Sequence, residues 1–178
     1  RTTHTTSSAA SDVYKRQLKF LFRQQSKTLR DSQSYNVVAE IKGSEFPEEV
    51  ILVGGHLDSW DIGDGAHDDG AGVVHSMDLL NIFNKISYRP KRTIRVVLFM
   101  NEENGGRGSN KYKEIADKDG IDHIFAIESD AGGFRPLGFS FTCSDSNFLK
   151  ILERKKLFAP YYINAVSYTH LTLPTTLS

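Results

Sequence analysis

Three apolar segments of this chain each end on side chains that can bind a metal ion. The segment EEVILVGG leads into His56 and Asp58, TIRVVLFM leads to Glu102 and Glu103, and HIFAIES leads into Asp130. Apolar, β-branched runs of this length are typical of buried strands in a parallel sheet. Ligands of open α/β sheets gather beyond the carboxyl ends of the strands. The pattern therefore predicts one shared site, acidic enough to need a cation.

A second acidic pair, Asp68 and Asp69, follows the first of these strands in the segment GAHDDG. Both precede residues 70–85, where apolar residues recur at helical spacing. Asp69 is suited to cap that helix, because a carboxylate can accept hydrogen bonds from the first N–H groups of a helix. We therefore predict that Asp68 binds metal and that Asp69 supports it.

The donor types limit the choice of cation. One imidazole with several carboxylates suits zinc, or less tightly manganese or cobalt, whereas an all-oxygen set suits calcium or magnesium. An EF-hand calcium loop counted from Asp58 would need acidic or amide groups where Trp60 and Ile62 stand, so it is not indicated. Five or six protein ligands exceed what one tetrahedral zinc ion uses. A pair of zinc ions about 3.5–4 Å apart accommodates them and predicts hydrolase chemistry.

Glu102 and Glu103 are predicted to have different roles. If both follow the strand on an extended backbone, their side chains point to opposite sides. One can then bind a metal ion while the other faces the substrate as a general base. The Asp58 carboxylate is predicted to hold the imidazole nitrogen of His56 that does not bind metal.

Composition excludes several classes of partner. The 178 residues hold 22 basic and 22 acidic side chains, so no excess of charge indicates a nucleic acid or a membrane surface. No apolar run approaches the length of a membrane span. Cys143 is the single cysteine, so an intramolecular disulfide is excluded and the redox compartment stays open.

The chain divides into a central domain and two tails of different composition. Residues 1–17 and 165–178 are rich in Thr and Ser and lack periodicity, which predicts non-native or disordered tails. Between them, residues 18–164 alternate strand and helix patterns, which predicts a layered α/β fold with a partly parallel sheet. Strands are predicted over 34–43, 48–55, 93–100, 123–129 and 138–143, and helices over 18–30, 70–85, 109–118 and 145–156.

Three segments in order, GGHLDSWDIGDGAHDDGAG, RPKRTIRVVLFMNEENGG and ESDAGG, resemble the M28 metallopeptidases, most closely their carboxypeptidase Q (plasma glutamate carboxypeptidase) branch. The resemblance runs from Tyr35 to Pro136. It implies the zinc-exopeptidase fold, a three-layer α/β/α sandwich around a mixed, mostly parallel sheet, which is incomplete here. It also implies a peptide or dipeptide substrate and, by family analogy, a secreted or periplasmic protein. A homodimer is left open.

The same resemblance implies a role for each candidate residue. Four residues would ligate the two zinc ions of the full-length catalytic domain: His56 and Asp130 one ion, Glu103 the other, and Asp68 both. Glu102 would be the catalytic general base and acid, and Asp58 would orient the imidazole ligand.

The family pattern has two further features. The peptide bond between Asp68 and Asp69 is typically cis. A second histidine ligand follows Asp130 by several tens of residues, whereas the native part of this sequence is predicted to end near Asn164. The chain is therefore interpreted as a truncated catalytic domain, whose parent protein is active even where the fragment itself is not.

The predicted function of the parent protein is that of a metal-dependent exopeptidase, an amino-, carboxy- or dipeptidase. Water activated by two zinc ions would attack a terminal peptide bond, with Glu102 as general base. Two alternatives stay open. One is a single-zinc acyltransferase like the glutaminyl cyclases, which share the fold but usually lack the pair at Asp68 and Asp69. The other is a non-catalytic interaction module on a decayed peptidase domain.

Overall fold

The structure, a computed structural model, describes residues 21–130 and 133–167. The chain divides into two units, Arg1–Gln33 and Ser34–Ser178. Residues 21–33 have no regular secondary structure, so the helix predicted over 18–30 is wrong for the described part of that range. The helices and strands considered below all belong to the second unit.

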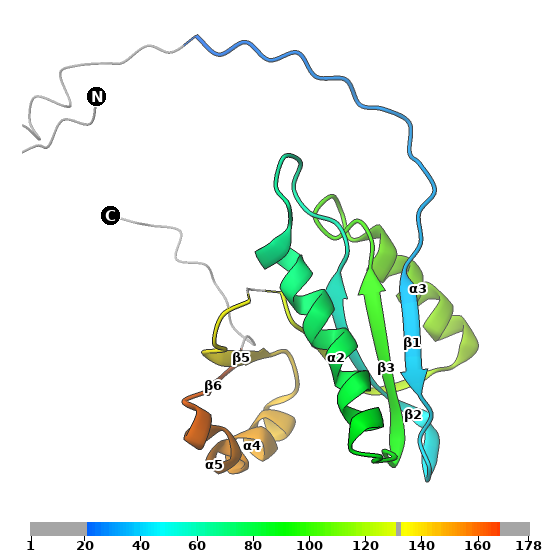
Figure 1. Cartoon of the computed structure of the whole chain (residues 1–178), viewed down its shortest axis with the longest axis vertical. Coiled ribbons are helices and arrows are strands. Elements are labelled where there is room, and N and C mark those ends of the chain that lie inside the picture. The colour runs from blue at the N-terminus through cyan, green and yellow to red at the C-terminus, as the bar shows by residue number, and fades with distance from the viewer. Residues whose placement is uncertain (1–20, 131–132, 168–178) are drawn as a thin grey trace, which may run out of the picture. The chain divides into compact units, whose positions relative to one another are not determined.

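Four strands form the main sheet, which is mixed and mostly parallel (Figure 1). They are β1 (Val37–Ile41), β2 (Phe46–His56), β3 (Arg92–Phe99) and β4 (Asp122–Glu128), in the order β1-β3-β2-β4. β3, β2 and β4 run parallel, and β1 lies antiparallel to β3. The three predicted apolar strands are therefore neighbours, and their carboxyl ends meet at the same edge of the sheet.

Helices cover both faces of this sheet. The two longest are α2 (Ala71–Lys85) and α3 (Arg107–Asp119). Gly55 of β2 faces α2, because a Cβ placed on it would lie 2.9 Å from the backbone of Gly72. Its neighbour Gly54 faces the Phe99 ring, which in turn meets the ring of Tyr112 on α3 at 5.9 Å. Adjacent residues of a strand point to opposite faces, so the predicted three-layer α/β/α arrangement is confirmed.

The apolar core is centred on β3, as its uninterrupted apolar sequence predicts. Leu52, Val97 and Phe99 pack together on the face that carries α3, with Tyr112 against them. On β3 itself every residue from Val96 to Phe99 is buried. This rigid central strand delivers the turn that holds Glu102 and Glu103.

The ends of α3 agree with the prediction at one terminus only. Gly120 ends the helix with φ 65°, the left-handed cap that glycine favours. The helix begins at Arg107, two residues before the start predicted at Ser109, and its N-cap is Gly106. The Ser109 hydroxyl instead donates to the Gly106 carbonyl oxygen at 3.0 Å.

A second, two-stranded parallel sheet follows in the chain. It consists of β5 (Gly138–Phe141) and β6 (Asn164–Ser167), with α4 (Asp145–Glu153), α5 (Lys155–Phe158) and the short 3-10 helix η2 (Ala159–Tyr161) between them in sequence. β6 crosses the domain boundary predicted at residue 164. Residues 1–17 and 168–178 of the predicted tails lie outside the described residues. No helix in the described ranges combines the length and the apolar character needed to cross a bilayer.

Gly72 brings the first turn of α2 close to the backbone that follows β4. A Cβ at this position would lie 1.7 Å from the Ser129 carbonyl oxygen. Gly72→Ala should therefore lower the free energy of unfolding by about 3 kcal/mol or more, because a clash with backbone cannot be relieved by a rotamer change. Urea unfolding followed by circular dichroism measures this loss.

Gly120→Ala is the matched control for the Gly72 substitution. Nothing lies within 4 Å of its Cβ position, and only its φ of 65° is unfavourable for alanine. We expect a loss of about 1 kcal/mol from this left-handed conformation alone. Equal losses at both glycines would contradict the steric explanation.

Candidate metal centre

The parallel strands bring the predicted ligands together at the carboxyl edge of the sheet. His56 is the last residue of β2, Glu102 and Glu103 follow β3, and Asp130 follows β4. The Nε2 atom of His56 lies 3.1 Å from Asp68 Oδ1, 3.4 Å from Asp130 Oδ1 and 4.0 Å from Glu102 Oε2. Residues separated by up to 74 positions thus surround one imidazole nitrogen.

The donor set fits a divalent metal ion. His56, Asp68 and Glu103 each offer a ligand atom within 4.8 Å of the others. The His56 ring is almost fully buried. The Oε1 atom of Glu103 is also buried and has no hydrogen-bond partner within the described residues. A buried carboxylate oxygen without a donor is costly unless a cation binds it, so this oxygen is the strongest sign of an ion.

His56 is held in place from two sides. Its backbone N–H donates to Asp69 Oδ2 at 2.8 Å, and its Nδ1 atom lies 2.8 Å from the Asp58 carbonyl oxygen. The nearest carboxylate oxygen of Asp58 is 3.8 Å from Nδ1. Asp58 therefore orients the ring through its backbone and not, as predicted, through its carboxylate. A proton on Nδ1 satisfies this carbonyl and leaves the Nε2 lone pair for a metal ion.

The Asp58 carboxylate has a different partner, the turn after β3. Its Oδ1 accepts the N–H of Glu102 at 2.9 Å, and its Oδ2 accepts the N–H of Glu103 at 3.2 Å. One aspartate thus connects the imidazole ligand with both glutamates.

The two glutamates do not lie on extended backbone, so the reason given for their different roles is wrong. β3 ends at Phe99, and residues 102–105 form a turn. Their surroundings nevertheless differ. The side chain of Glu102 is 46% exposed beside His56, whereas Glu103 has a buried oxygen.

Asp68 and Asp69 lie on η1 (Ala66–Gly70), a single π-turn directly before α2. The peptide bond between them is cis, as the resemblance implies. Asp69 is buried and accepts two N–H groups, from His56 and, at 3.0 Å, from Gly72 in the first turn of α2. Asp68 is the more exposed of the pair and points its Oδ1 at the imidazole.

The charges of the site shift its pKa values. Burial disfavours the imidazolium of His56, but the Asp58 carbonyl and the carboxylate of Asp69 outweigh it and raise the pKa of His56. Burial raises the pKa of Asp69, against the N–H groups that it accepts. Loss of solvation and the nearby Asp68 raise the pKa of Glu103.

Asn36 is a supporting residue that the sequence did not reveal. Its Oδ1 accepts the N–H of Met100 at 3.0 Å, and its Nδ2 donates to the Gly108 carbonyl oxygen at 2.8 Å. These bonds anchor both sides of the turn that carries Glu102 and Glu103. An asparagine before a strand is a common turn residue, so nothing in the sequence marked it.

A three-layer α/β/α domain with an imidazole and several carboxylates at the carboxyl edge of its sheet has the architecture of a metal-dependent hydrolase. The chain belongs to peptidase family M28, whose family model matches residues 36–169. Carboxypeptidase Q of Bos taurus is 44% identical over 140 residues, which cover 79% of this chain and 30% of that protein. Carboxypeptidase Q of Rattus norvegicus is 45% identical with the same coverage. The chain thus spans 30% of the length of these curated relatives.

Solved structures agree with this assignment. The chain superposes on a peptidase M28 precursor from Shewanella amazonensis SB2B with a TM-score of 0.70 and 36% identity, over 77% of this chain and 31% of that chain. LapB from Legionella pneumophila shares the fold with a TM-score of 0.59 at 19% identity, over 74% of this chain and 37% of that chain. The family resemblance and the α/β fold predicted from the sequence are both confirmed.

Proposed function

We propose that the protein to which this chain belongs is a zinc-dependent exopeptidase that hydrolyses a terminal peptide bond or a dipeptide. The observation that carries the proposal is the donor set: an oriented imidazole faced by three carboxylates, beside Glu103, whose buried oxygen has no hydrogen-bond partner among the described residues. Membership of family M28 and the carboxypeptidase Q relatives support peptide hydrolysis. Because the chain spans 30% of those relatives, the activity is proposed for the parent protein.

The ligands would be shared between two zinc ions. His56 and Asp130 would hold one ion, Glu103 the second, and Asp68 both. The 3.1 Å and 3.4 Å separations of the Asp68 and Asp130 oxygens from the imidazole support the first group. The grouping of Glu103 with Asp68 supports the second. Bound zinc supplies a water of lowered pKa and polarises the scissile carbonyl group.

Glu102 is the proposed general base and acid. Its carboxylate is 46% exposed and lies farther from His56 Nε2 than the carboxylates of Asp68 and Asp130 do, so a substrate could reach it. It would accept a proton from the attacking water and donate it to the leaving amine. Asp58 would position this base, since its carboxylate accepts the Glu102 N–H.

The other properties of the parent protein are proposed by family analogy alone. They are a secreted or periplasmic location and a peptide or dipeptide as substrate.

The two alternatives, a single-zinc acyltransferase and a module without metal, are less well supported. Both Asp68 and Asp69 are present and in place, which favours a two-ion site over one zinc. A module without metal would leave the buried oxygen of Glu103 uncompensated.

Zinc stoichiometry tests the proposal against both alternatives. Metal-free protein would be titrated with zinc by isothermal calorimetry, alongside a dipeptide hydrolysis assay with and without chelator. We expect the parent protein to bind two zinc ions and to lose hydrolysis on chelation, and the 178-residue chain to bind at least one. One ion with acyl transfer supports the acyltransferase, and no ion in either polypeptide supports the binding module.

A further inference from the structure

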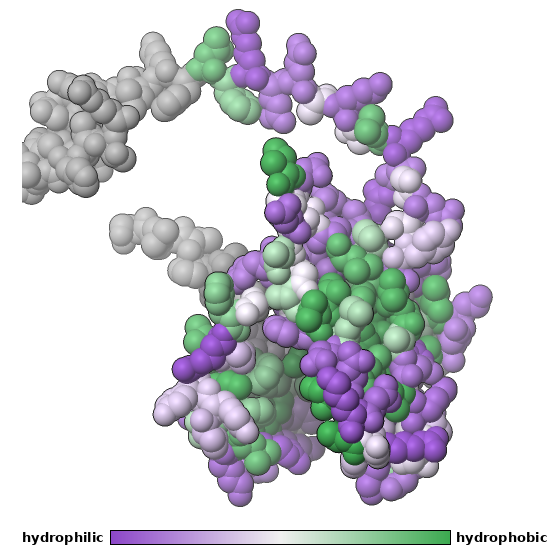
Figure 2. Space-filling model, viewed as in Figure 1, coloured by the Kyte–Doolittle hydropathy of each residue, from purple (hydrophilic) through white to green (hydrophobic). Residues whose placement is uncertain are grey.

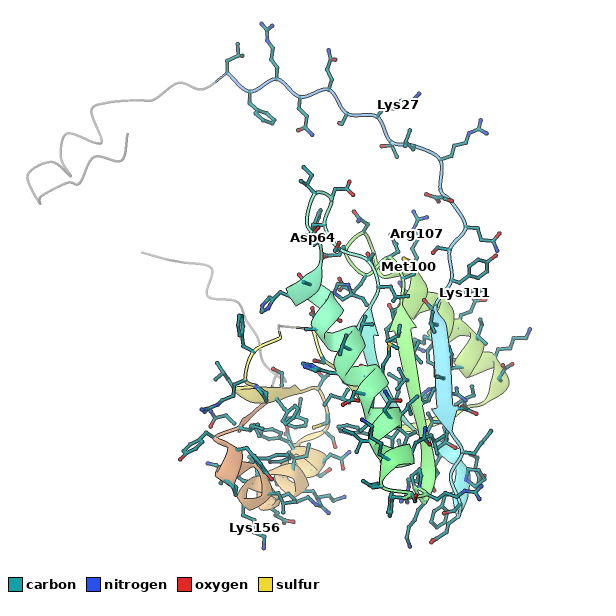
Figure 3. All side chains as sticks on the ribbon, in the orientation of Figure 1. Lys27, Asp64, Met100, Arg107, Lys111 and Lys156 are labelled. Carbon is teal, nitrogen blue, oxygen red and sulfur yellow. The ribbon has the colours of Figure 1, made fainter. Side chains whose placement is uncertain are left out.

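A loop with exposed apolar side chains projects beside the metal centre. It spans residues 57–65 between β2 and η1, and it is flanked by two proposed ligands, His56 directly before it and Asp68 three residues after it. Its Trp60 side chain is 62% exposed, and Ile62 is fully exposed. Figure 3 places Asp64 of this loop at the same end of the sheet as Met100, which follows β3. Figure 2 shows hydrophobic surface at the projecting end of the loop.

The loop has a defined shape. The Gly63 N–H donates to the Trp60 carbonyl oxygen at 3.1 Å and closes a four-residue turn. The two sides of the loop also touch, because a Cβ on Gly65, where φ is 64°, would lie 2.7 Å from the Ser59 Cβ. The two apolar side chains are therefore held outward by a built turn.

Ile62 is a costly residue at its position in this turn. Its φ is 78°, in the left-handed region that β-branched residues avoid. Glycine or asparagine would fit the third position of such a turn with less strain. The side chain gains no burial within the described residues in return. Strained residues of this kind cluster at ligand-binding sites.

Trp60 lies near Asp58, the residue that contacts the turn of the proposed catalytic base. It follows Asp58 by two residues, and two residues of fully extended chain span at most about 7 Å. The Asp58 carboxylate accepts the N–H groups of Glu102 and Glu103. The backbone of Trp60 therefore lies within about 7 Å of the residue that holds the turn presenting Glu102.

We propose that Trp60 and Ile62 form an apolar wall of the substrate site and select peptides with a large aromatic or aliphatic side chain beside the scissile bond. This inference rests on the proposed peptidase function. Indole packs favourably against aromatic and aliphatic groups and loses little conformational freedom in doing so. Loss of such an apolar contact lowers discrimination between substrates by about 10–200-fold.

Fluorescence tests this contact directly. Trp60 is the single tryptophan of the chain, so tryptophan emission reports on this loop alone. The zinc-loaded chain would be titrated with two uncleavable reduced-amide dipeptide analogues, one of diphenylalanine and one of diglycine. We expect the aromatic analogue to shield Trp60 from acrylamide quenching and the diglycine analogue to leave the quenching unchanged.

Variants separate a specificity role from a structural one. Trp60→Ala should weaken the affinity for the aromatic analogue, measured by calorimetry, about 10-fold or more and leave the affinity for the diglycine analogue unchanged. Trp60→Phe should keep most of the affinity for the aromatic analogue, because phenylalanine retains an aromatic ring. Ile62→Gly should raise the Tm, because glycine relieves the φ strain, and should still weaken aromatic binding. If Ile62 served only the folding of the loop, a variant that raises the Tm would not also lower the affinity for the aromatic analogue. Ile82→Ala, an exposed apolar position on α2, is the control.

Zinc titration of the same samples distinguishes the two ways of failing. Absence of zinc binding would overturn the proposed function, and this inference with it. Zinc binding without shielding by the aromatic analogue, or unchanged discrimination in Trp60→Ala, would overturn this inference and leave the peptidase proposal standing. If acrylamide quenching of Trp60 fell with rising protein concentration in the absence of either analogue, the loop would pack against a second copy of the chain. That result would also overturn this inference.

Discussion

Glu102→Gln is expected to lower kcat of the parent enzyme by about 10²–10⁴-fold while zinc binding stays nearly unchanged, because glutamine keeps the shape of the side chain but cannot accept the proton. Glu102 Oε2 lies 4.0 Å from His56 Nε2, farther than the nearest oxygens of Asp68 and Asp130, and its side chain is 46% exposed. Loss of its charge therefore leaves the inner donors intact. Steady-state dipeptide hydrolysis, with zinc content measured on the same preparation, checks the result.

Glu103→Gln is the matched variant at the neighbouring position. Its buried Oε1 has no partner in the described part of the chain, so we expect zinc content to fall together with activity. The two variants together then distinguish the loss of proton transfer expected at Glu102 from the loss of metal binding expected at Glu103. If both variants lost zinc equally, the assignment of Glu102 as general base would be wrong.

Asp68→Asn should weaken zinc binding by about 100-fold or more, since loss of even an outer partner of a ligand costs 10–100-fold. Asp68 Oδ1 is the carboxylate oxygen closest to His56 Nε2, and the side chain is 53% exposed, so the fold should tolerate the change. Competition with a chelator measures the affinity. Zinc should raise the Tm of the unsubstituted chain, because an ion that binds only the folded state stabilises it. The same zinc concentration should raise the Tm of the Asp68→Asn variant much less.

Asp64→Asn is the control for this substitution. Asp64 lies on the neighbouring exposed loop and carries the same charge, but it is outside the donor set. Its zinc affinity should equal that of the native chain. A similar loss in both variants would show that general negative charge, and not ligation by Asp68, attracts the ion.

The elements and the location of the site could be predicted because they follow from local patterns. Apolar runs specify β2, β3 and β4, helical spacing specifies α2, and Gly120 specifies the end of α3. Parallel strands end at one edge, so side chains that follow them must converge there. One prediction that failed also concerns a local feature, the start of α3. The helix predicted to start at Ser109 begins at Arg107 instead, because Gly106 in the left-handed conformation caps it.

The sequence by itself determined which residues are candidates for metal binding: an imidazole and carboxylates that follow three consecutive apolar strands, in a chain of family M28. Tertiary structure alone decided how they are held. Asp58 uses its carbonyl for His56 and its carboxylate for a turn 44 residues away, and Asn36 ties that turn to β1. Each of these bonds depends on the direction of an oxygen relative to a distant N–H group. Residue type and spacing carry no such directions, because they arise only when the strands pack side by side.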